Sequence, residues 1–303
     1  MSDFLSKFQE NLILSLFPHG ARITQANYFQ SDYLPSPMRV LVSLPNGEQR
    51  NVVLRMSRKP FGVARETPLL PILSRLGLQV PTVLSEITSD PNDANAGSMT
   101  VLSFLSGENL QTWSCKSSAA LEMASGILFE AVTRLHQLTE SLSQEKISAL
   151  LPRKSLATEL QDVIQAAGLC IKNAVFSEAV EKLMPALNSI QTPLVFSNGD
   201  YQPGNFLSNG KELTGFVDFE HACFEDPHVG FAKYRIYDLH PLNKAGVVER
   251  YLQINNLSES DFAPRLAVRC LWTLQNEIPV SERNRDYSQH VLRLLENSLK
   301  LLN

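Results

Sequence analysis

Residues 195–227, VFSNGDYQPGNFLSNGKELTGFVDFEHACFEDP, place three oxygen-bearing polar residues beside short apolar runs. Asp200 follows the apolar run PLVF, Asn205 comes after a Gln-Pro-Gly turn, and Asp218 ends the apolar run LTGFV. In a hairpin of this length both strand ends can face one pocket. A lone aspartate at a strand end is most often a turn residue. The spacing of the three residues together predicts a pocket with two carboxylates and one amide oxygen.

This set of side chains fits phosphoryl transfer. Magnesium prefers hard oxygen ligands, usually one or two carboxylates together with substrate phosphates and water. The acceptor hydroxyl needs a nearby aspartate that orients it and takes its proton. Protein kinases assign these tasks with D-x-x-x-x-N followed by a strand-end D-F. The stretch therefore predicts a phosphotransferase that requires Mg²⁺ and uses ATP, with GTP also open, to phosphorylate a hydroxyl of a small molecule.

NGDYQPGNFL followed by LTGFVDFEHACFEDP resembles the aminoglycoside phosphotransferase family, which includes choline-kinase-like and other small-molecule kinases. Four flanking segments resemble family segments in the expected order, and they are VVLRMS, ARETPLLPILSRLGLQVPTVL, MTVLSFLSGENL and TRLHQL. The resemblance implies an α+β, two-lobed, protein-kinase-like fold. It implies a small β-rich nucleotide-binding lobe over residues 1–105 and a larger, mainly helical catalytic and substrate lobe over residues 106–303.

The same resemblance implies a role for each matching residue. Asp200 would be the catalytic base, and Asn205 and Asp218 would be magnesium ligands. Arg55 and Glu66 would form the ion pair on the phosphate side of the nucleotide. Backbone groups at the connector between the lobes would meet the adenine, and these belong to Ser103, Phe104 and Leu105.

The sequence departs from the family pattern at four places. Asn198 stands where the family has a histidine, and its amide is expected to hold the loop as a histidine would. Arg55 replaces a lysine, and Gly230 replaces an aspartate in a structural position. The segment where a kinase has a glycine-rich phosphate loop contains Gly20 at its start, and Asn27 and Ser31 are the candidates for contacting phosphates.

These departures keep a second function open, namely a kinase-fold protein that binds nucleotide or acts as a scaffold without catalysis. A protein kinase is disfavoured because no A-P-E segment follows DFE. A dinucleotide enzyme is disfavoured because no G-x-G-x-x-G follows a strand. Asp226 is expected to be a structural tie beside Pro227, and His136 a packing residue behind the catalytic loop. Glu220 stays open between a metal ligand and a solvated residue.

Periodicity predicts the elements around this core. Residues 39–47 and 50–57 form a hairpin across a Pro-Asn-Gly turn, and residues 22–29, 82–87 and 98–105 are further strands. A helix is expected to start near Thr67 with Pro68 at its first position. The last two hundred residues are mainly helical, with helices expected over 117–139, 155–168, 174–189, 228–239, 243–255, 259–277 and 283–302.

Composition limits the partners. The formal net charge of −4 and the pI near 5.9 argue against nucleic acid as a partner. The four cysteines never form C-x-x-C, so buried thiols are expected. The first twenty residues read as an amphipathic helix without a signal cleavage site, and no apolar run is long enough to span a membrane. We expect a cytoplasmic protein, while its oligomeric state and its acceptor stay open. A polycationic acceptor would need acidic residues, for which Glu225, Asp238, Glu249 and Glu277 are available.

Overall fold

The structure is a computed structural model that describes residues 5–29, 35–59, 62–93, 97–168, 172–277 and 285–302. The chain forms two compact units. The first unit runs to Glu108 and also includes Phe206–Asn209 and Leu213–Ala222. The second unit includes Asn109–Asn205 and Gly210–Glu212, and it continues from Cys223. The fold class is α+β, as predicted, with an antiparallel sheet in the N-terminal part and mostly helices in the C-terminal part.

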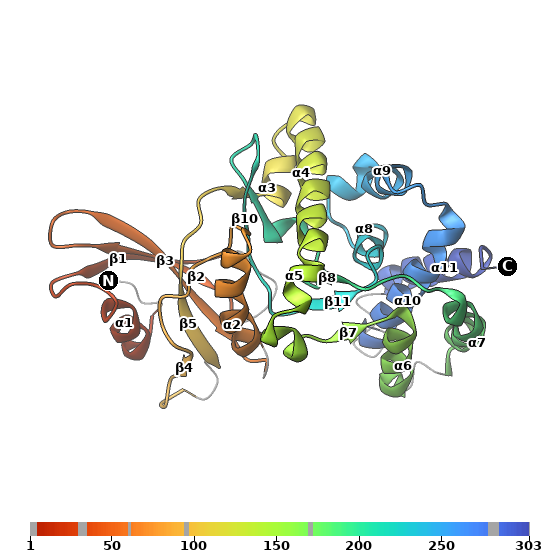
Figure 1. Cartoon of the computed structure of the whole chain (residues 1–303), viewed down its shortest axis with the longest axis horizontal. Helices are drawn as coiled ribbons and strands as arrows, with labels where there is room; N and C mark the ends of the chain where they lie inside the picture. The colour runs from red at the N-terminus through yellow and green to blue at the C-terminus, as the bar shows by residue number, and fades with distance from the viewer. Residues whose placement is uncertain are drawn as a thin grey trace. The chain divides into compact units, whose positions relative to one another are not determined.

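The first unit is built on a five-stranded sheet with the strand order β1-β2-β3-β5-β4 (Figure 1). All neighbouring strands run antiparallel. The unit also contains two helices and the antiparallel strand pair β9 and β10. The elements are α1 (Lys7–Leu14), β1 (Arg22–Tyr28), β2 (Met38–Ser43), β3 (Gln49–Ser57), α2 (Gly62–Arg75), β4 (Thr88–Ser89), β5 (Ser98–Ser103), β9 (Phe206–Ser208) and β10 (Leu213–Phe216).

The alternation of apolar residues fixes which way each strand of this sheet faces. Leu54 and Met56 of β3 lie in one buried cluster with Ile13 of α1 and with apolar residues of β1, β2 and β5. Successive side chains of a strand point to opposite faces. Arg55 therefore points to the face opposite this cluster, on the side of α2. The predicted hairpin is confirmed, because β2 pairs with β3 across a turn in which Gly47 N donates to Leu44 O.

Two predictions for the first unit are wrong. Helix α2 begins at Gly62 and not near Thr67, so Pro68 and Pro71 lie inside it. Its buried apolar face, with Leu69 and Leu73, stabilises the helix despite the backbone hydrogen bonds that the prolines remove. Residues 82–87 form no strand, and Val83 makes only an isolated bridge to Leu102.

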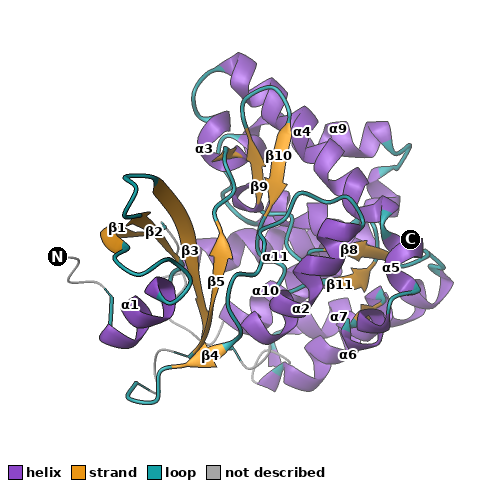
Figure 2. Ribbon diagram, turned by 60° about the vertical axis from the view of Figure 1, so that its left-hand side comes forward, coloured by secondary structure: helices purple, strands orange, loops and turns teal. Residues whose placement is uncertain are grey.

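The second unit is mainly helical (Figure 2). Helix α10 is its central element, because it packs on α6, α7 and α11. Its helices are α3 (Leu110–Ser114), α4 (Ser118–Gln137), α5 (Thr139–Ser143), α6 (Leu156–Ala166), α7 (Ala174–Ser189), α8 (Lys233–Ile236), α9 (Val247–Ile254), α10 (Glu259–Glu277) and α11 (Arg285–Leu299). The predicted helices are thus present, except that 228–239 is divided into the 3-10 helix η5 (Val229–Ala232) and the short α8.

Three short strands in the second unit lead to the loop that carries Asp200. They are β7 (Arg153–Lys154), β8 (Val195–Ser197) and β11 (Cys223–Glu225), with β11 in the middle. Strand β8 packs against α4 and leads directly into residues 198–202 and the 3-10 helix η4 (Pro203–Asn205). The two-residue strand β6 (Glu108–Asn109) lies where the chain passes from the first unit to the second.

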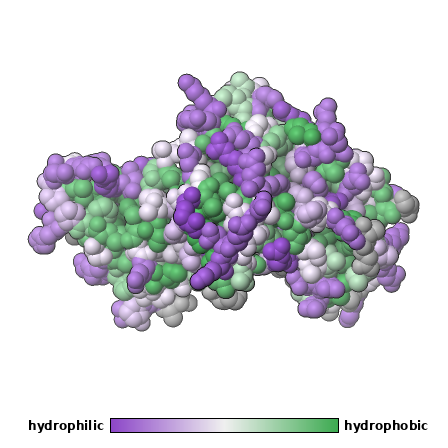
Figure 3. Space-filling model, in the orientation of Figure 1, coloured by the Kyte–Doolittle hydropathy of each residue, from purple (hydrophilic) through white to green (hydrophobic). Residues whose placement is uncertain are grey.

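The surface mixes hydrophobic and hydrophilic residues on the face drawn in Figure 3. Exposed apolar side chains such as Leu150 and Ile254 are ordinary for a folded protein. Among the residues that the structure describes, no helix combines the length and the apolar character needed to cross a membrane.

Candidate functional site

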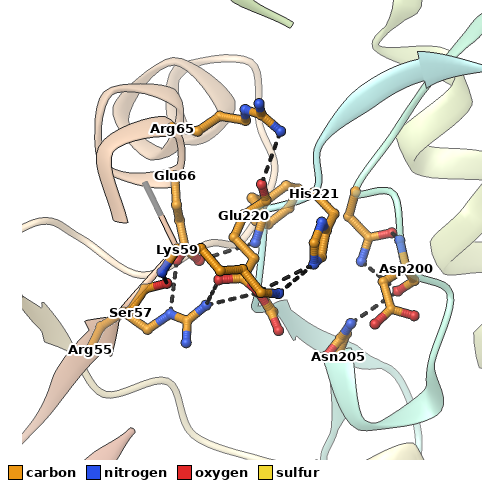
Figure 4. A network of polar contacts seen from close by, with 12 residues as sticks. Arg55, Ser57, Lys59, Arg65, Glu66, Asp200, Asn205, Glu220 and His221 are labelled. Atoms are coloured by element: carbon orange, nitrogen blue, oxygen red, sulfur yellow. Dashed lines mark hydrogen bonds and ion pairs between the residues drawn. The ribbon is translucent and has the colours of Figure 1, made fainter. Parts of the chain in front are cut away.

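Arg55 is the centre of a charged network in the first unit (Figure 4). Its Nε donates to Glu66 Oε2 at 3.0 Å, and its Nη2 lies 3.0 Å from both Asp218 Oδ1 and Glu220 Oε2. The Arg55 side chain is only 13% exposed. Burial opposes its charge, but the three carboxylates outweigh burial and raise the pKa of Arg55 further. The guanidinium is therefore a fixed positive charge at this position.

Glu66 joins three segments of the first unit. The residue is buried on α2, and its second carboxylate oxygen, Oε1, accepts a hydrogen bond from Phe219 N at 3.1 Å. The predicted ion pair with Arg55 is present in the structure at 3.0 Å. Glu66 thus ties α2 both to β3 and to the segment that carries Asp218.

Asp218 lies two residues after the end of β10, in a backbone conformation that residues other than glycine seldom adopt. Its φ is +63°, in the left-handed region. Non-glycine residues there cost roughly 1–3 kcal/mol and are concentrated at functional sites. The side chain is 36% exposed, and the contact with Arg55 engages Oδ1. Within the described part of the chain, Oδ2 is the oxygen left for a ligand.

Glu220 is not a solvated residue, and its carboxylate is occupied by neighbouring cations. Its side chain is 11% exposed, and besides Arg55 it contacts Lys59 Nζ at 2.6 Å and His221 Nε2 at 3.2 Å. Although burial opposes it, the contacts with His221, Lys59 and Arg55 hold the pKa of Glu220 well below its usual range. Arg65 of α2 adds a further contact by donating to the carbonyl oxygen of Glu220. Glu220 therefore holds two cations, Arg55 and Lys59, which are among the basic residues of the stretch RMSRKP at 55–60.

The loop after β8 holds Asp200 through its own backbone. Asn198 is 1% exposed, its Nδ2 donates to Asp200 O at 2.9 Å, and its Oδ1 accepts from Asp200 N at 3.2 Å. Asn205 Nδ2 donates to the same carbonyl oxygen at 3.0 Å (Figure 4). Gly199 supplies the positive φ, 75°, that this tight turn needs. Asn198 thus holds the loop through both backbone groups of Asp200, which is the role expected of it.

The Asp200 carboxylate itself has two partners. Oδ1 accepts a hydrogen bond from Gln202 N at 3.2 Å, and it forms an ion pair with Nζ of Lys233 on α8. The Asp200 side chain is 25% exposed, whereas that of Lys233 is 9% exposed. The Asp200 carboxylate is therefore partly exposed, while its cation is buried.

The contacts of Tyr201 account for His136 and Gly230, two positions for which the sequence predicted structural roles. Its hydroxyl lies 2.8 Å from His136 Nε2, and Tyr234 OH donates to its carbonyl oxygen at 2.7 Å. Burial lowers the pKa of His136 to about 4, so the ring is neutral and packs behind the loop, as predicted. A Cβ at Gly230 would lie 2.3 Å from the Tyr201 ring. Glycine replaces the family's aspartate there because only glycine leaves room for this ring.

Asp226 is a structural tie, as expected. It is 2% exposed, accepts from His228 N at 2.9 Å, and binds Arg265 of α10 through both oxygens at 3.0 and 2.9 Å. This two-pronged pair joins the end of β11 to the central helix.

The segment that is expected to meet the nucleotide base begins at the end of β5. Ser103 N donates to Thr82 O at 2.8 Å, so this N–H is already engaged. The backbone groups of Phe104 and Leu105 follow beyond the strand end. The Arg39 guanidinium lies 4.6 Å from the centre of the Phe104 ring.

The two candidates for a phosphate loop have different outcomes. Asn27 is exposed on β1, where it pairs with Arg39 of β2. Ser31 lies outside the described residues, as does Cys170.

The side chains present fit magnesium in their chemistry. Asn205 uses its amide nitrogen on the Asp200 carbonyl, which leaves Oδ1, a hard oxygen, for a cation. Asp218, in the first unit, offers Oδ2 as a hard oxygen of its own. Groups of three or more His, Cys, Asp or Glu side chains suited to a metal are absent from the described residues. Magnesium needs few protein ligands, because phosphates and water usually complete its coordination.

Sequence reasoning missed Lys233 and the role of Lys59. Lys233 lies in the apolar run VGFAKYRIY, where a lysine gives no sign of its partner. Lys59 was visible only as part of a basic stretch, and its partner Glu220 lies 161 residues away.

Comparison with known proteins identifies the family. The model of the phosphotransferase enzyme family matches residues 36–261, so the chain belongs to this family. No curated protein matches the chain significantly.

Solved structures share the kinase-like fold. A thermostable mutant of aminoglycoside phosphotransferase APH(4)-Ia, in a ternary complex with ADP and hygromycin B, is 12% identical with a TM-score of 0.69, covering 96% of this chain and 98% of the other. The GDP and kanamycin complex of APH(2″)-IIIa is 17% identical with a TM-score of 0.64, covering 95% and 97%. Choline kinase from Streptococcus pneumoniae is 15% identical with a TM-score of 0.59, covering 98% of each chain. At these identities the likeness establishes the fold, and the acceptor has to be argued from the residues.

Proposed function

We propose that this protein is an ATP- and magnesium-dependent phosphotransferase that acts on a hydroxyl of a small molecule. The observation that carries the proposal is the loop in which Asn198 and Asn205 hold the backbone of Asp200 at 2.9–3.2 Å while its carboxylate stays partly exposed. A fixed, accessible carboxylate is what a catalytic base requires. The first unit would be the nucleotide-binding lobe and the second the catalytic and substrate lobe.

In the proposed reaction the Asp200 carboxylate takes the proton of the acceptor hydroxyl while that oxygen attacks the γ-phosphorus. The bond from this phosphorus to the β–γ bridging oxygen breaks, and ADP leaves with the electron pair. Arg55 contacts the phosphates and is oriented by Glu66, and the backbone of Phe104 and Leu105 meets the adenine. Magnesium, when bound by Asn205 and Asp218, would neutralise charge on the phosphates.

The test is phosphate transfer by the purified protein. ADP release and transfer of labelled γ-phosphate are measured over a panel of hydroxyl compounds with ATP and Mg²⁺, with GTP in parallel and EDTA as the metal-free arm. Asp200→Asn should lower turnover by about 10²- to 10⁴-fold, the usual contribution of a positioned base. Asp162→Asn, on the exposed face of α6 in the same unit, is the matched control and should keep the rate. An unchanged rate in Asp200→Asn would contradict the proposal.

A second candidate function is a nucleotide-binding or scaffold protein without transfer. One observation favours it, because both carboxylates proposed for chemistry are paired with cations, Asp218 with Arg55 and Asp200 with Lys233. A thermal-shift titration separates the two, since a ligand that binds only the native state raises Tm by mass action. A shift with ATP and Mg²⁺ but no transfer to any hydroxyl compound would favour this second function.

A further inference from the structure

Lys233 is a buried cation at the carboxylate that the proposed reaction uses. It is 7% exposed, it begins α8, and its neighbours Phe231, Ala232 and Tyr234 are buried as well. Its ammonium group forms an ion pair with Oδ1 of Asp200. A buried lysine without a partner would be strongly unfavourable. The ion pair is therefore a built feature of the second unit and differs from the surface pairs, whose contribution is small.

The pair removes the net charge that Asp200 would otherwise present. Burial and the charge of Arg269 on α10 lower the pKa of Lys233, and the ion pair with the Asp200 carboxylate opposes this effect. In the ion pair the ammonium and carboxylate charges cancel. An acceptor next to the ion pair therefore meets no net charge from Asp200 and Lys233.

Arg269 adds positive charge near this pair. It interacts electrostatically with Lys233, and its guanidinium lies 4.4 Å from the centre of the Trp272 ring. Trp272 is 40% exposed and offers an apolar surface on the same helix. The positive charge of Arg269 near this pair thus disfavours a cationic acceptor.

Two of the four acidic residues that the sequence offers for a polycation are not available to it. Glu225 is 6% exposed within β11. Glu249 is held by Arg235 at 3.1 Å, and Asp238 accepts a hydrogen bond from Asn243 at 3.1 Å. The side chain of the fourth candidate, Glu277, lies outside the described part of the structure. Of the three described acids, Glu225 is buried and Glu249 is paired with a cation, whereas Asp238 is exposed and has a neutral partner.

We infer that the phosphate acceptor is a hydroxyl compound without net positive charge, such as a sugar, a polyol or a hydroxy acid, and that Lys233 sets this preference. The inference rests on the proposed function and narrows its substrate class. It separates this chain from the aminoglycosides and choline named for the proteins of similar fold.

The experiment uses sets of acceptors that share a skeleton and differ in charge. Glucosamine, glucose and glucuronate form one set, and short polyols and ring-bearing alcohols with amino, neutral and carboxylate versions form others. The full-length protein is assayed with MgATP, and kcat/KM is compared within each set. The neutral or anionic member should be preferred by about tenfold, because the charge of Arg269 near the neutral pair disfavours a cation.

Lys233→Met tests whether the lysine sets the preference. Removing it leaves Asp200 with its negative charge, so the ratio of cationic to neutral kcat/KM should rise by about tenfold. Lys233→Gln is the second variant if the methionine variant folds poorly, as judged by Tm. Lys244→Met, an exposed lysine on the 3-10 helix η6 (Leu242–Ala245) in the same unit, is the matched control and should keep the wild-type ratio.

Preference of the wild-type protein for cationic members would overturn the inference, and so would equal losses of kcat/KM for all members in Lys233→Met. Asp200-dependent ATP hydrolysis without transfer to any member would overturn the inference and leave a phosphate-transfer site standing. Absence of both transfer and Asp200-dependent hydrolysis would instead overturn the proposed function, and the inference with it.

Discussion

Replacing Arg55 with methionine should destabilise the first unit far more than the loss of an ordinary surface charge. The substitution keeps much of the length of the side chain but leaves Glu66, which is 4% exposed, without its cation. Removing one partner of a buried ion pair costs about 3–5 kcal/mol, because the other charge stays buried. Asp218 is 36% exposed and Glu220 keeps Lys59, so these two contribute less. We expect a total loss of about 3–5 kcal/mol in the free energy of unfolding.

The measurement is urea unfolding at neutral pH, with Arg50→Met as the matched control. Arg50 lies on the same strand and pairs with Glu48, but its side chain is 59% exposed. Its loss should change the free energy of unfolding by no more than about 0.5 kcal/mol. Glu66→Gln in the Arg55→Met background should recover part of the loss, because glutamine keeps an acceptor for Phe219 N without the charge. Equal effects of Arg55→Met and Arg50→Met would refute the reasoning.

Three further predictions concern the second unit. Asp226→Asn should cost about 3–5 kcal/mol in urea unfolding, because it leaves the Arg265 guanidinium buried without its carboxylate; a loss below about 1 kcal/mol would contradict this. His136 has a pKa of about 4 in the folded chain against about 6.5 unfolded, so its contribution is complete above pH 6.5 and lost toward pH 4, by up to about 3 kcal/mol; His136→Gln should flatten that part of the stability–pH curve. Glu159 affects stability in the opposite direction, because burial and Glu225 raise its pKa to about 7 and its ionisation above that pH destabilises the fold. Glu159→Gln should therefore raise Tm at pH 8 and change it little near pH 4.5.

The fold could be predicted where local pattern and tertiary packing agree. The hairpin of β2 and β3 has alternating apolar residues and a Pro-Asn-Gly turn, and both signals favour the same register. The start of α2 was missed because two prolines argue against a helix at that point, whereas burial of Val63, Leu69 and Leu70 stabilises it. Local propensity is a weak guide when a buried face decides the outcome.

Residues 82–87 show a different reason for failure. Their apolar pattern predicts a strand, but Ser85 takes part in the hydrogen bonding itself. Ser85 Oγ accepts from Val101 N at 2.9 Å, and Thr100 Oγ1 donates to Ser85 O at 2.8 Å. These side-chain bonds replace the regular backbone ladder. Serine side chains that compete with backbone pairing cannot be recognised from an alternating pattern.

The candidate site likewise has residues that could be predicted from the sequence and residues that could not. The spacing of Asp200, Asn205 and Asp218 could be read from the sequence because one loop and one hairpin carry all three residues. Lys233 could not, because its partner is set by how α8 packs on the loop. Motifs locate the acids, whereas the cations that set their charge come from elements that share no motif with them.

The pairing of Asp218 with Arg55 is compatible with a role for Asp218 as a metal ligand. Arg55 makes three ionic contacts, and the loss of the one to Asp218 would leave those to Glu66 and Glu220. A divalent cation interacts about twice as strongly as a guanidinium with the same carboxylate at equal distance and dielectric constant. The exchange of a shared monovalent partner for a divalent one is therefore favourable at Asp218. Asp200 has no such exchange, because its partner Lys233 is buried and has Asp200 as its carboxylate partner, so in the proposed reaction the acceptor would bind beside a neutral pair.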